Sequence, residues 1–240
     1  MPKRFVVASS DFPEVPHFPM GFELAEALTV AAQQLHETST ANGALRAAAR
    51  LAVHVLPGAE HAGISVIEKT HRQTLAWTDE VVRSADALNA GREHHLYWSR
   101  LWTAPVARID DSAAYDSGEL SFSGLGLRSV LSLRLRADRR RLTVLTAYAR
   151  KPRAFDESAT RVGRLFTAHV SIALESVTAR EQLTEAMRTR DLIGQATGIL
   201  MERLGIDAGA AFDSLVRTSQ RENVKLRDLA RRLVDTMRHE

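Results

Sequence analysis

The stretch RDLIGQATGILMER, residues 190–203, decides the fold of the C-terminal part of the chain. Its apolar residues recur every three or four positions, as they do on one face of an amphipathic helix. Gly194 and Gly198 each make a helix about 1 kcal/mol less stable than alanine would. We therefore expect both glycines to allow close backbone approach, Met201 to pack in the core, and Gly205 to end the helix.

Two shorter helices are predicted after this one. Asp207 is suited to cap the first of them, because its side chain can accept a backbone N–H. The inward-facing positions are Ala211, Phe212, Leu215 and Val216 in one helix, and Leu226, Leu229, Ala230, Leu233, Val234 and Met237 in the other. The pattern predicts three short helices around one shared core, with Phe212 as its central side chain.

The order of these segments resembles the ANTAR domain, a small three-helix module that binds structured RNA in transcription antitermination. The resemblance rests on residues 198–201 (GILM), 211–212 (AF), 219–220 (SQ), Asn223 and 225–230 (KLRDLA). It implies binding to a dual stem-loop in an mRNA leader, where the bound protein disfavours the terminator hairpin. Many relatives have lysine where this chain has Thr197, so one cation of the family pattern is missing.

The side chains outside the predicted core are the candidate RNA contacts. Arginine and lysine hold phosphates, and amide or hydroxyl side chains read the edges of unstacked loop bases. The ten candidates are Arg190, Gln195, Thr197, Arg203, Arg217, Ser219, Gln220, Asn223, Lys225 and Arg227. No aromatic residue follows Phe212, so we expect arginine planes to take the place of rings in stacking on bases.

Upstream, helices are expected over residues 21–37 and 43–56, the second with Asn42 as its cap. Alternating patterns then predict two hairpins, whose strands are residues 62–67, 73–77, 129–136 and 142–149. In the strand 129–136 Val130 and the leucines should face the core, and the serines and arginines should face solvent.

A further helix should begin after Asp156 and continue without a linker into residue 190. Its apolar stripe is predicted to contain Val162, Leu165, Phe166, His169, Ile172, Ala173 and Ser176. Helices this long often form coiled coils between protomers, so we expect a homodimer.

This order of elements, with RSVLSL at residues 128–133 and AFD at 154–156, is similar to the GAF sensor domain. The resemblance covers about residues 40–177, and actinobacterial GAF–ANTAR proteins have the two domains in this order. It implies a role in signal sensing or in dimerisation. Many such GAF domains carry an acidic Gly-Pro-Cys segment where residues 91–99 of this chain read GREHHLYWS.

A small-molecule pocket is weakly indicated by His94, His95, Trp98 and Trp102, although packing in the core explains these residues more simply. Adjacent histidines point apart on a helix or strand, and no third ligand is evident, so we expect no metal. The sequence has no phosphate-loop lysine after its Gly124–Gly126 pair and no nucleophile elbow, so we expect neither a cofactor nor an enzyme.

Charge is unevenly distributed, although the net charge is only +3. Residues 121–153 contain nine basic residues and one acid, and the turn Asp138–Arg141 is either a solvated turn or a phosphate-binding patch. Residues 181–240 contain ten basic and ten acidic residues. Phosphate binding there must depend on how the arginines are placed.

The 240 residues suit two modest domains, and 45% hydrophobic content allows a real core. There is no cysteine and no apolar run near the roughly 20 residues of a membrane span, so we expect a cytoplasmic protein without disulfides. The predicted fold class is α+β: a GAF-like antiparallel sheet flanked by helices, joined by a long helix to an all-α three-helix bundle.

Three segments follow: a lead-in over residues 1–20, a GAF-like sensor or dimerisation domain over 21–177, and an ANTAR-like domain over 178–240. Expected partners are RNA, a second copy of the chain and an unidentified small molecule, with no membrane. The alternative is a ligand-sensing or protein-interaction module that binds no RNA. DNA binding is disfavoured, because the arginines of the last helix are offset by Asp228, Asp235 and Glu240.

Overall fold

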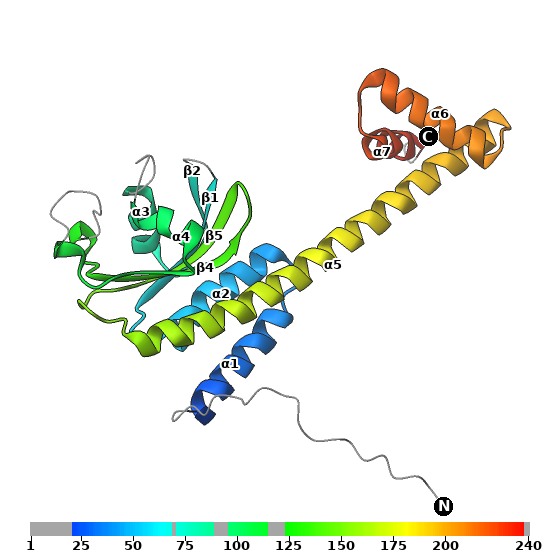
Figure 1. The fold of residues 1–240 in the computed structure, drawn as a ribbon. Helices are drawn as coiled ribbons and strands as arrows, with labels where there is room; N and C mark the ends of the chain where they lie inside the picture. The colour runs from blue at the N-terminus through cyan, green and yellow to red at the C-terminus, as the bar shows by residue number, and fades with distance from the viewer. Residues whose placement is uncertain (1–20, 69–70, 89–95, 115–122, 238–240) are drawn as a thin grey trace, which may run out of the picture. The chain divides into compact units, whose positions relative to one another are not determined.

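The structure is a computed structural model that describes residues 21–68, 71–88, 96–114 and 123–237 (Figure 1). The predicted lead-in over residues 1–20 lies outside these ranges. The chain divides into two compact units. The sheet unit comprises Met1–Glu37 and Leu45–Ser171, and the helical unit comprises Thr38–Ala44 and Ile172–Glu240.

The sheet unit is built on five antiparallel strands in the order β2-β1-β5-β4-β3. Their bounds are β1 His61–Glu68, β2 His71–Trp77, β3 Val106–Ile109, β4 Ser129–Ala137 and β5 Arg141–Ala149. Both predicted hairpins are confirmed, and β1 pairs with β5 in the middle of the sheet. The strand β3 was not predicted, because four residues are too few to show an alternating pattern.

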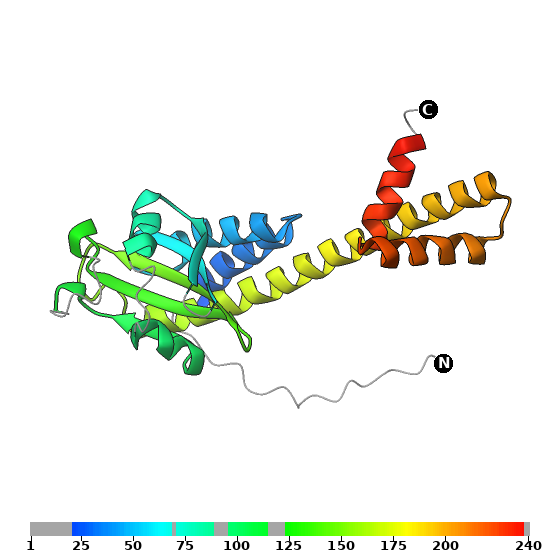
Figure 2. The same ribbon diagram turned by 90° about the horizontal axis from the view of Figure 1, so that it is seen from above.

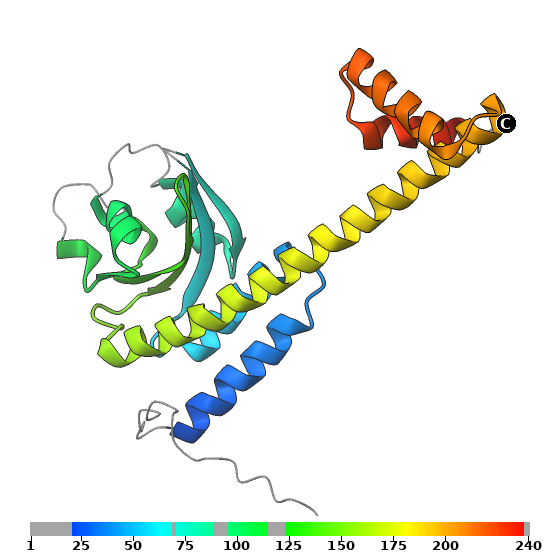
Figure 3. The ribbon, with the colours of Figure 1, turned by 45° about the vertical axis from the view of Figure 1, so that its right-hand side comes forward.

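Helices cover both faces of this sheet. On one face lie α3 (Glu80–Leu88) and α4 (Leu96–Thr103); on the other lie α2 (Ala41–Val55) and the first turns of α5 (Glu157–Leu204), with α1 (Gly21–His36) beside them (Figure 3). A Cβ added to Gly63 of β1 would meet the Val82 side chain of α3 at 2.5 Å. A Cβ added to Gly163 of α5 would meet Leu133 of β4 at 2.6 Å. The helices therefore pack directly on the strands.

The expectation that β4 turns its serines and arginines to solvent holds for Arg136, which is exposed, but is wrong for Ser132 and Arg134. Ser132 is fully buried and lies 3.1 Å from the Thr146 hydroxyl, so the two hydroxyls share a hydrogen bond. The Arg134 guanidinium donates to the carbonyls of Leu101 and Trp102, which end α4. Alternation marks the two faces of a strand correctly, but it cannot show that a second layer of helices covers the polar face.

The helix starts are fixed by short side chains. Asp156 caps α5 as predicted, since its carboxylate accepts the N–H of Ala159 over 2.7 Å. The predicted cap of α2 is wrong: Thr40 accepts the N–H of Gly43 over 3.0 Å, and the helix already includes Asn42. The α1 helix occupies the predicted segment.

The prediction of one uninterrupted helix into the C-terminal motif is confirmed, because α5 runs for 48 residues. Its apolar stripe was predicted only in part. Val162 and Phe166 are buried, but Leu165 is 37% exposed and Ile172 is 68% exposed. At about 100° per residue, the buried Val162, Phe166 and Val170 span about 80° around α5, and Leu165 and Ile172 fall about 60° and 80° outside that arc.

The helical unit packs α6 (Ala208–Glu222) and α7 (Leu226–Met237) against the last turns of α5 (Figure 2). Gly205 has φ +62° and ends α5, as predicted. Asp207 caps α6 by accepting the N–H of Ala210 over 2.8 Å, which confirms the predicted cap. The predicted fold class is therefore confirmed. Among the residues that the structure describes, no helix combines the length and apolar content that a bilayer span requires.

Candidate functional site

The helical unit has a small core. Where its three helices meet, five residues are buried: Ala196, Ala211, Leu215, Ala230 and Val234. The remaining predicted leucines and isoleucines of α5 and α7 pack around them and stay partly exposed. The predicted Met237 lies outside the described side chains. A core of this size leaves much of the apolar content of the unit at its surface.

Two residues predicted to pack inside are exposed. Phe212 was expected as the central side chain of the core, but 43% of it is exposed, and Ala211 and Leu215 are buried instead. Met201 is 37% exposed. Ala211 and Phe212 are adjacent in α6 and point about 100° apart, and Ala211, about one turn before the buried Leu215, shares the face of that leucine.

Phe212 lies at the edge of an open groove of about 760 Å³ between α5 and α6. The groove is lined by Glu181, Gln182, Glu185, Ala186, Thr189, Arg190, Ile193 and Phe212. Glu185 also pairs with Arg227 of α7 at 3.8 Å, and Glu181 accepts the N–H of Ala41 over 3.1 Å. One predicted RNA contact, Arg190, therefore lines a mostly apolar groove, and another, Arg227, pairs with a carboxylate of its lining.

Gly194 and Gly198 do not allow close packing within the chain, and that prediction is wrong. No described atom lies within 4 Å of a Cβ added at either position, and both glycines are exposed. They lie four residues apart on α5 and leave a strip of bare helix backbone at the surface.

Most of the ten predicted RNA contacts are exposed. Seven of them are exposed side chains: Arg190, Gln195, Arg203, Arg217, Gln220, Asn223 and Lys225. The other three are partly buried and bond within the unit. Thr197 donates to the Ile193 carbonyl over 2.8 Å, Ser219 donates to the Val224 carbonyl over 2.6 Å, and Arg227 lies 3.6 Å from Asp228.

The end of α6 gathers three of the predicted residues. Asn223 adopts a left-handed conformation with φ 52°, and its N–H donates to the carbonyls of Gln220 and Ser219. Asparagine tolerates this conformation better than most residues. Ser219 and Asn223 therefore shape the turn into α7, whereas Gln220 remains exposed there.

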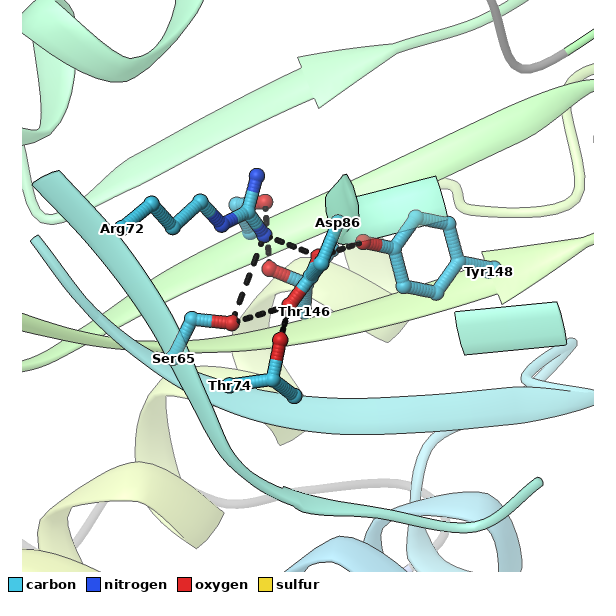
Figure 4. A network of polar contacts seen from close by, with 7 residues as sticks. Ser65, Arg72, Thr74, Asp86, Thr146 and Tyr148 are labelled. Carbon is cyan, nitrogen blue, oxygen red and sulfur yellow. Dashed lines mark hydrogen bonds and ion pairs between the residues drawn. The ribbon is translucent and has the colours of Figure 1, made fainter. Parts of the chain in front are cut away.

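The sheet unit contains a buried polar network that the sequence did not reveal (Figure 4). The Asp86 carboxylate of α3 accepts hydrogen bonds from Ser65 and Thr74 over 2.5 Å each and from Tyr148 over 3.1 Å. Arg72 forms an ion pair with the same carboxylate. The Arg72 and Asp86 side chains are only 5% and 4% exposed, so this charge pair lies inside the unit.

Burial, together with the negative charge of Asp86, raises the pKa of Tyr148 well above its usual value, so this hydroxyl stays protonated and donates. One signal for the network was present in the sequence. Asp86 lies four residues after the buried Val82 and next to the buried Ala85, so a charge occupies the inward face of α3.

The weakly indicated ligand residues are not brought together among the described residues. His94 and His95 lie outside the described ranges, and Trp98 lies in α4 with its side chain undescribed. Trp102 packs against the apolar core between the sheet and α4, as the simpler explanation predicted.

Comparison with protein families gives two matches. The model of the GAF domain matches residues 38–175, and the model of the ANTAR domain matches residues 181–234. The first match covers more than half of the chain, so the protein belongs to the GAF family, and with its C-terminal ANTAR domain it is a GAF–ANTAR protein. ANTAR domains are RNA-binding modules of antitermination regulators and GAF domains are sensory modules; neither is a catalytic family.

Solved structures agree with this fold. The bacteriophytochrome RpBphP3 from R. palustris has a TM-score of 0.58 at 16% identity, over 86% of this chain and 47% of that one. The Stigmatella aurantiaca phytochrome photosensory core module gives 0.55 at 13% identity, over 84% and 46%. The GAF domain of an Acinetobacter phosphoenolpyruvate-protein phosphotransferase gives 0.50 at 12% identity, over 67% and 97%.

The chain spans about half the length of the two phytochrome structures. At these identities the likeness shows the GAF fold alone. A comparison with curated proteins finds no significant match.

Proposed function

We propose that this protein is a transcription antitermination regulator that binds two stem-loops in nascent mRNA through its C-terminal domain. The ANTAR match over residues 181–234 carries the proposal. The exposure of seven predicted contacts supports it, because phosphates and unstacked bases can be reached only by side chains at the surface.

The glycine strip of α5 supports a nucleic-acid partner as well. Gly194 and Gly198 have no neighbour within the described chain, yet each makes the helix about 1 kcal/mol less stable than alanine would. The bare backbone at Gly194 and Gly198 lets a bulky ribose-phosphate chain approach α5 closely, and Arg190, about one turn before Gly194, lies on the same face. We propose that the strip is part of the RNA-binding face.

A homodimer is the second part of the proposal. Ile172, Leu183 and Met187 are 68%, 64% and 60% exposed. At about 100° per residue they fall within about 60° of one another around α5, so they form one apolar stripe. Such a stripe is typical of a parallel coiled coil, in which the same residues of a second copy would cover it.

Two copies would present two RNA-binding domains, and the binding of one stem-loop would raise the effective concentration of the second domain near the other stem-loop. The GAF domain, residues 21–177 by our assignment, would sense a signal or strengthen the dimer. Because α5 belongs to both units, a change in the pairing of α5 would transmit a signal most simply. Nascent mRNA places the protein in the cytoplasm.

The test is binding of the full-length protein to a labelled RNA with two stem-loops, over a salt series from about 50 to 300 mM KCl. Arg190→Ala plus Lys225→Ala should weaken binding and flatten the salt dependence. Arg188→Ala plus Arg231→Ala removes two other exposed cations of the same unit and serves as the matched control. Equal loss in both variants, or no binding of the unchanged protein at low salt, would contradict the proposal.

One observation favours the alternative of a protein-interaction module. The groove at Phe212 is mostly apolar and carries two carboxylates, Glu181 and Glu185, which suit a basic, apolar peptide better than they suit phosphate. A protein that binds no RNA but loses a protein partner on Phe212→Ala would support this alternative.

A further inference from the structure

The hairpin formed by β4 and β5 ends in arginines that the C-terminal domain does not explain. The strands stay paired up to Ala137 and Leu142, and the N–H of Asp138 donates to the Arg141 carbonyl over 2.9 Å to close the turn. Around this turn Arg136, Arg139 and Arg140 are all exposed. We call these three residues the arginine tip.

The only acid in the turn is occupied by backbone groups. The Asp138 carboxylate accepts the N–H of Arg140 over 3.1 Å and the N–H of Arg141 over 2.9 Å. These two hydrogen bonds lower the pKa of Asp138, and the positive charges of Arg136 and Arg141 add to the effect. Asp138 therefore shapes the turn as an anion, and within the described chain it forms no ion pair with the arginine tip.

Other arginines of this basic stretch have partners. Arg128 forms two hydrogen bonds with Asp111, over 2.7 and 2.6 Å, and Arg141 pairs with Glu68 at 3.4 Å. Arg134 is held by two carbonyls of α4. By contrast, none of the described carboxylates lies within ion-pair distance of Arg136, Arg139 or Arg140. Arg150 and Lys151, just after β5, are exposed as well; the hairpin end is distinguished because three such arginines gather around one turn.

We propose that the arginine tip is a second RNA-binding surface, which holds the phosphate backbone of the RNA bound by the ANTAR domain. This inference rests on the proposed function. A guanidinium binds a phosphate through two parallel hydrogen bonds, so three of them in one turn suit a phosphodiester chain. The turn has no amide or hydroxyl side chain to read bases, so the contact is independent of RNA sequence.

The charge balance of the chain favours this partner. The ANTAR domain lies in a segment with equal numbers of acids and bases, so it attracts polyanions only weakly from a distance. The arginine tip gives the chain a second, positively charged site for the same RNA. A membrane surface fits less well, because the turn offers no large apolar side chain that could insert beside the charges.

The experiment uses the full-length protein and a labelled two-stem-loop RNA with a flanking duplex extension. The tip variant carries Arg136→Gln, Arg139→Gln and Arg140→Gln. The control carries Arg150→Gln, Lys151→Gln and Arg161→Gln, which remove the same charge from exposed positions that follow β5 or open α5. At about 3.4 Å per residue, the start of the control region lies roughly 27 Å along β5 from the tip.

Each lost phosphate contact should lower the slope of log K against log salt by about 0.7–0.9. The magnitude of this slope should therefore fall by about 2 in the tip variant. The tip variant should also bind RNA roughly ten to a hundred times more weakly at low salt. The control should keep the slope of the unchanged protein. Melting curves should be alike, because all six side chains are exposed. If the tip variant and the unchanged protein have equal slopes, this inference is overturned and the proposed function stands. If the unchanged protein binds no RNA, both the inference and the proposed function are overturned.

Discussion

The two units of this protein use polar and apolar residues in opposite ways. The sheet unit encloses an ion pair, Arg72 with Asp86, under helices that cover both faces of the sheet. The helical unit has only five buried residues where its three helices meet, and it exposes Phe212, Met201 and Met187. A fully enclosed polar network makes the conformation of the sheet unit rigid. Exposed apolar side chains on the helical unit indicate a surface that a partner covers.

The largest effect expected from this comparison is at Asp86. Asp86→Ala leaves the buried Arg72 without its carboxylate and removes the acceptor of Ser65, Thr74 and Tyr148, so the sheet unit should lose about 3–5 kcal/mol of stability. All three tryptophans lie between residues 77 and 102, so tryptophan fluorescence during urea unfolding reports on this unit alone. Glu80→Ala, on the exposed side of the same helix, should cost less than about 0.5 kcal/mol. Similar losses in both variants would mean that the network does not stabilise the unit.

Sequence reasoning succeeded where one residue decides a local structure. Asp156, Asp207 and Gly205 end or begin helices through their own backbone or side-chain geometry, and such effects do not depend on the rest of the fold. Four of the five strands also followed from alternation alone.

The errors concern which layer covers a given face. Ser132 and Arg134 were assigned to solvent because their strand alternates, yet α4 lies over them. Phe212 was assigned to the core because it is large and apolar, yet Leu215 and Ala211 fill that space. Periodicity divides an element into faces, but only the tertiary packing decides what each face meets.

The second prediction contrasts two apolar residues of α6. Leu215→Ala should destabilise the helical unit by about 2–4 kcal/mol, because Leu215 is buried in its small core. Phe212→Ala should cost less than about 1 kcal/mol, since much of the ring is already in water. Hydrogen exchange of residues 192–234, measured by mass spectrometry, follows this unit without a tryptophan. Equal losses would place Phe212 in the core after all.

The third prediction uses glycines that differ in conformation. Gly194→Ala should stabilise the helical unit by about 0.5–1 kcal/mol, because the position is helical and has open space around it. Gly205→Ala should destabilise it by about 1 kcal/mol, since φ there is +62°. If the glycine strip contacts RNA, Gly194→Ala should also weaken RNA binding despite its greater stability. Unchanged affinity would remove the strip from the proposed RNA-binding face.

The smallest effect is a dependence on pH within the sheet unit. Hydrogen bonds from Arg128 lower the pKa of Asp111 from 3.8 to about 2. The folded state therefore favours the ionised carboxylate, and its contribution is present above about pH 4 and lost as the pH falls towards 2. Asp111→Asn should flatten the melting temperature of the unit between about pH 5 and 2. A variant that keeps the full slope would show that other carboxylates cause it.

The most direct test of the central claim is a competition measurement. The full-length protein is bound to a labelled two-stem-loop RNA and challenged, at one salt concentration, with the same RNA unlabelled or with duplex DNA of equal length. Unlabelled RNA should displace the labelled RNA, and duplex DNA at the same concentration should not. Equal displacement by RNA and DNA would show that the protein binds polyanions without recognising RNA, and would contradict the account.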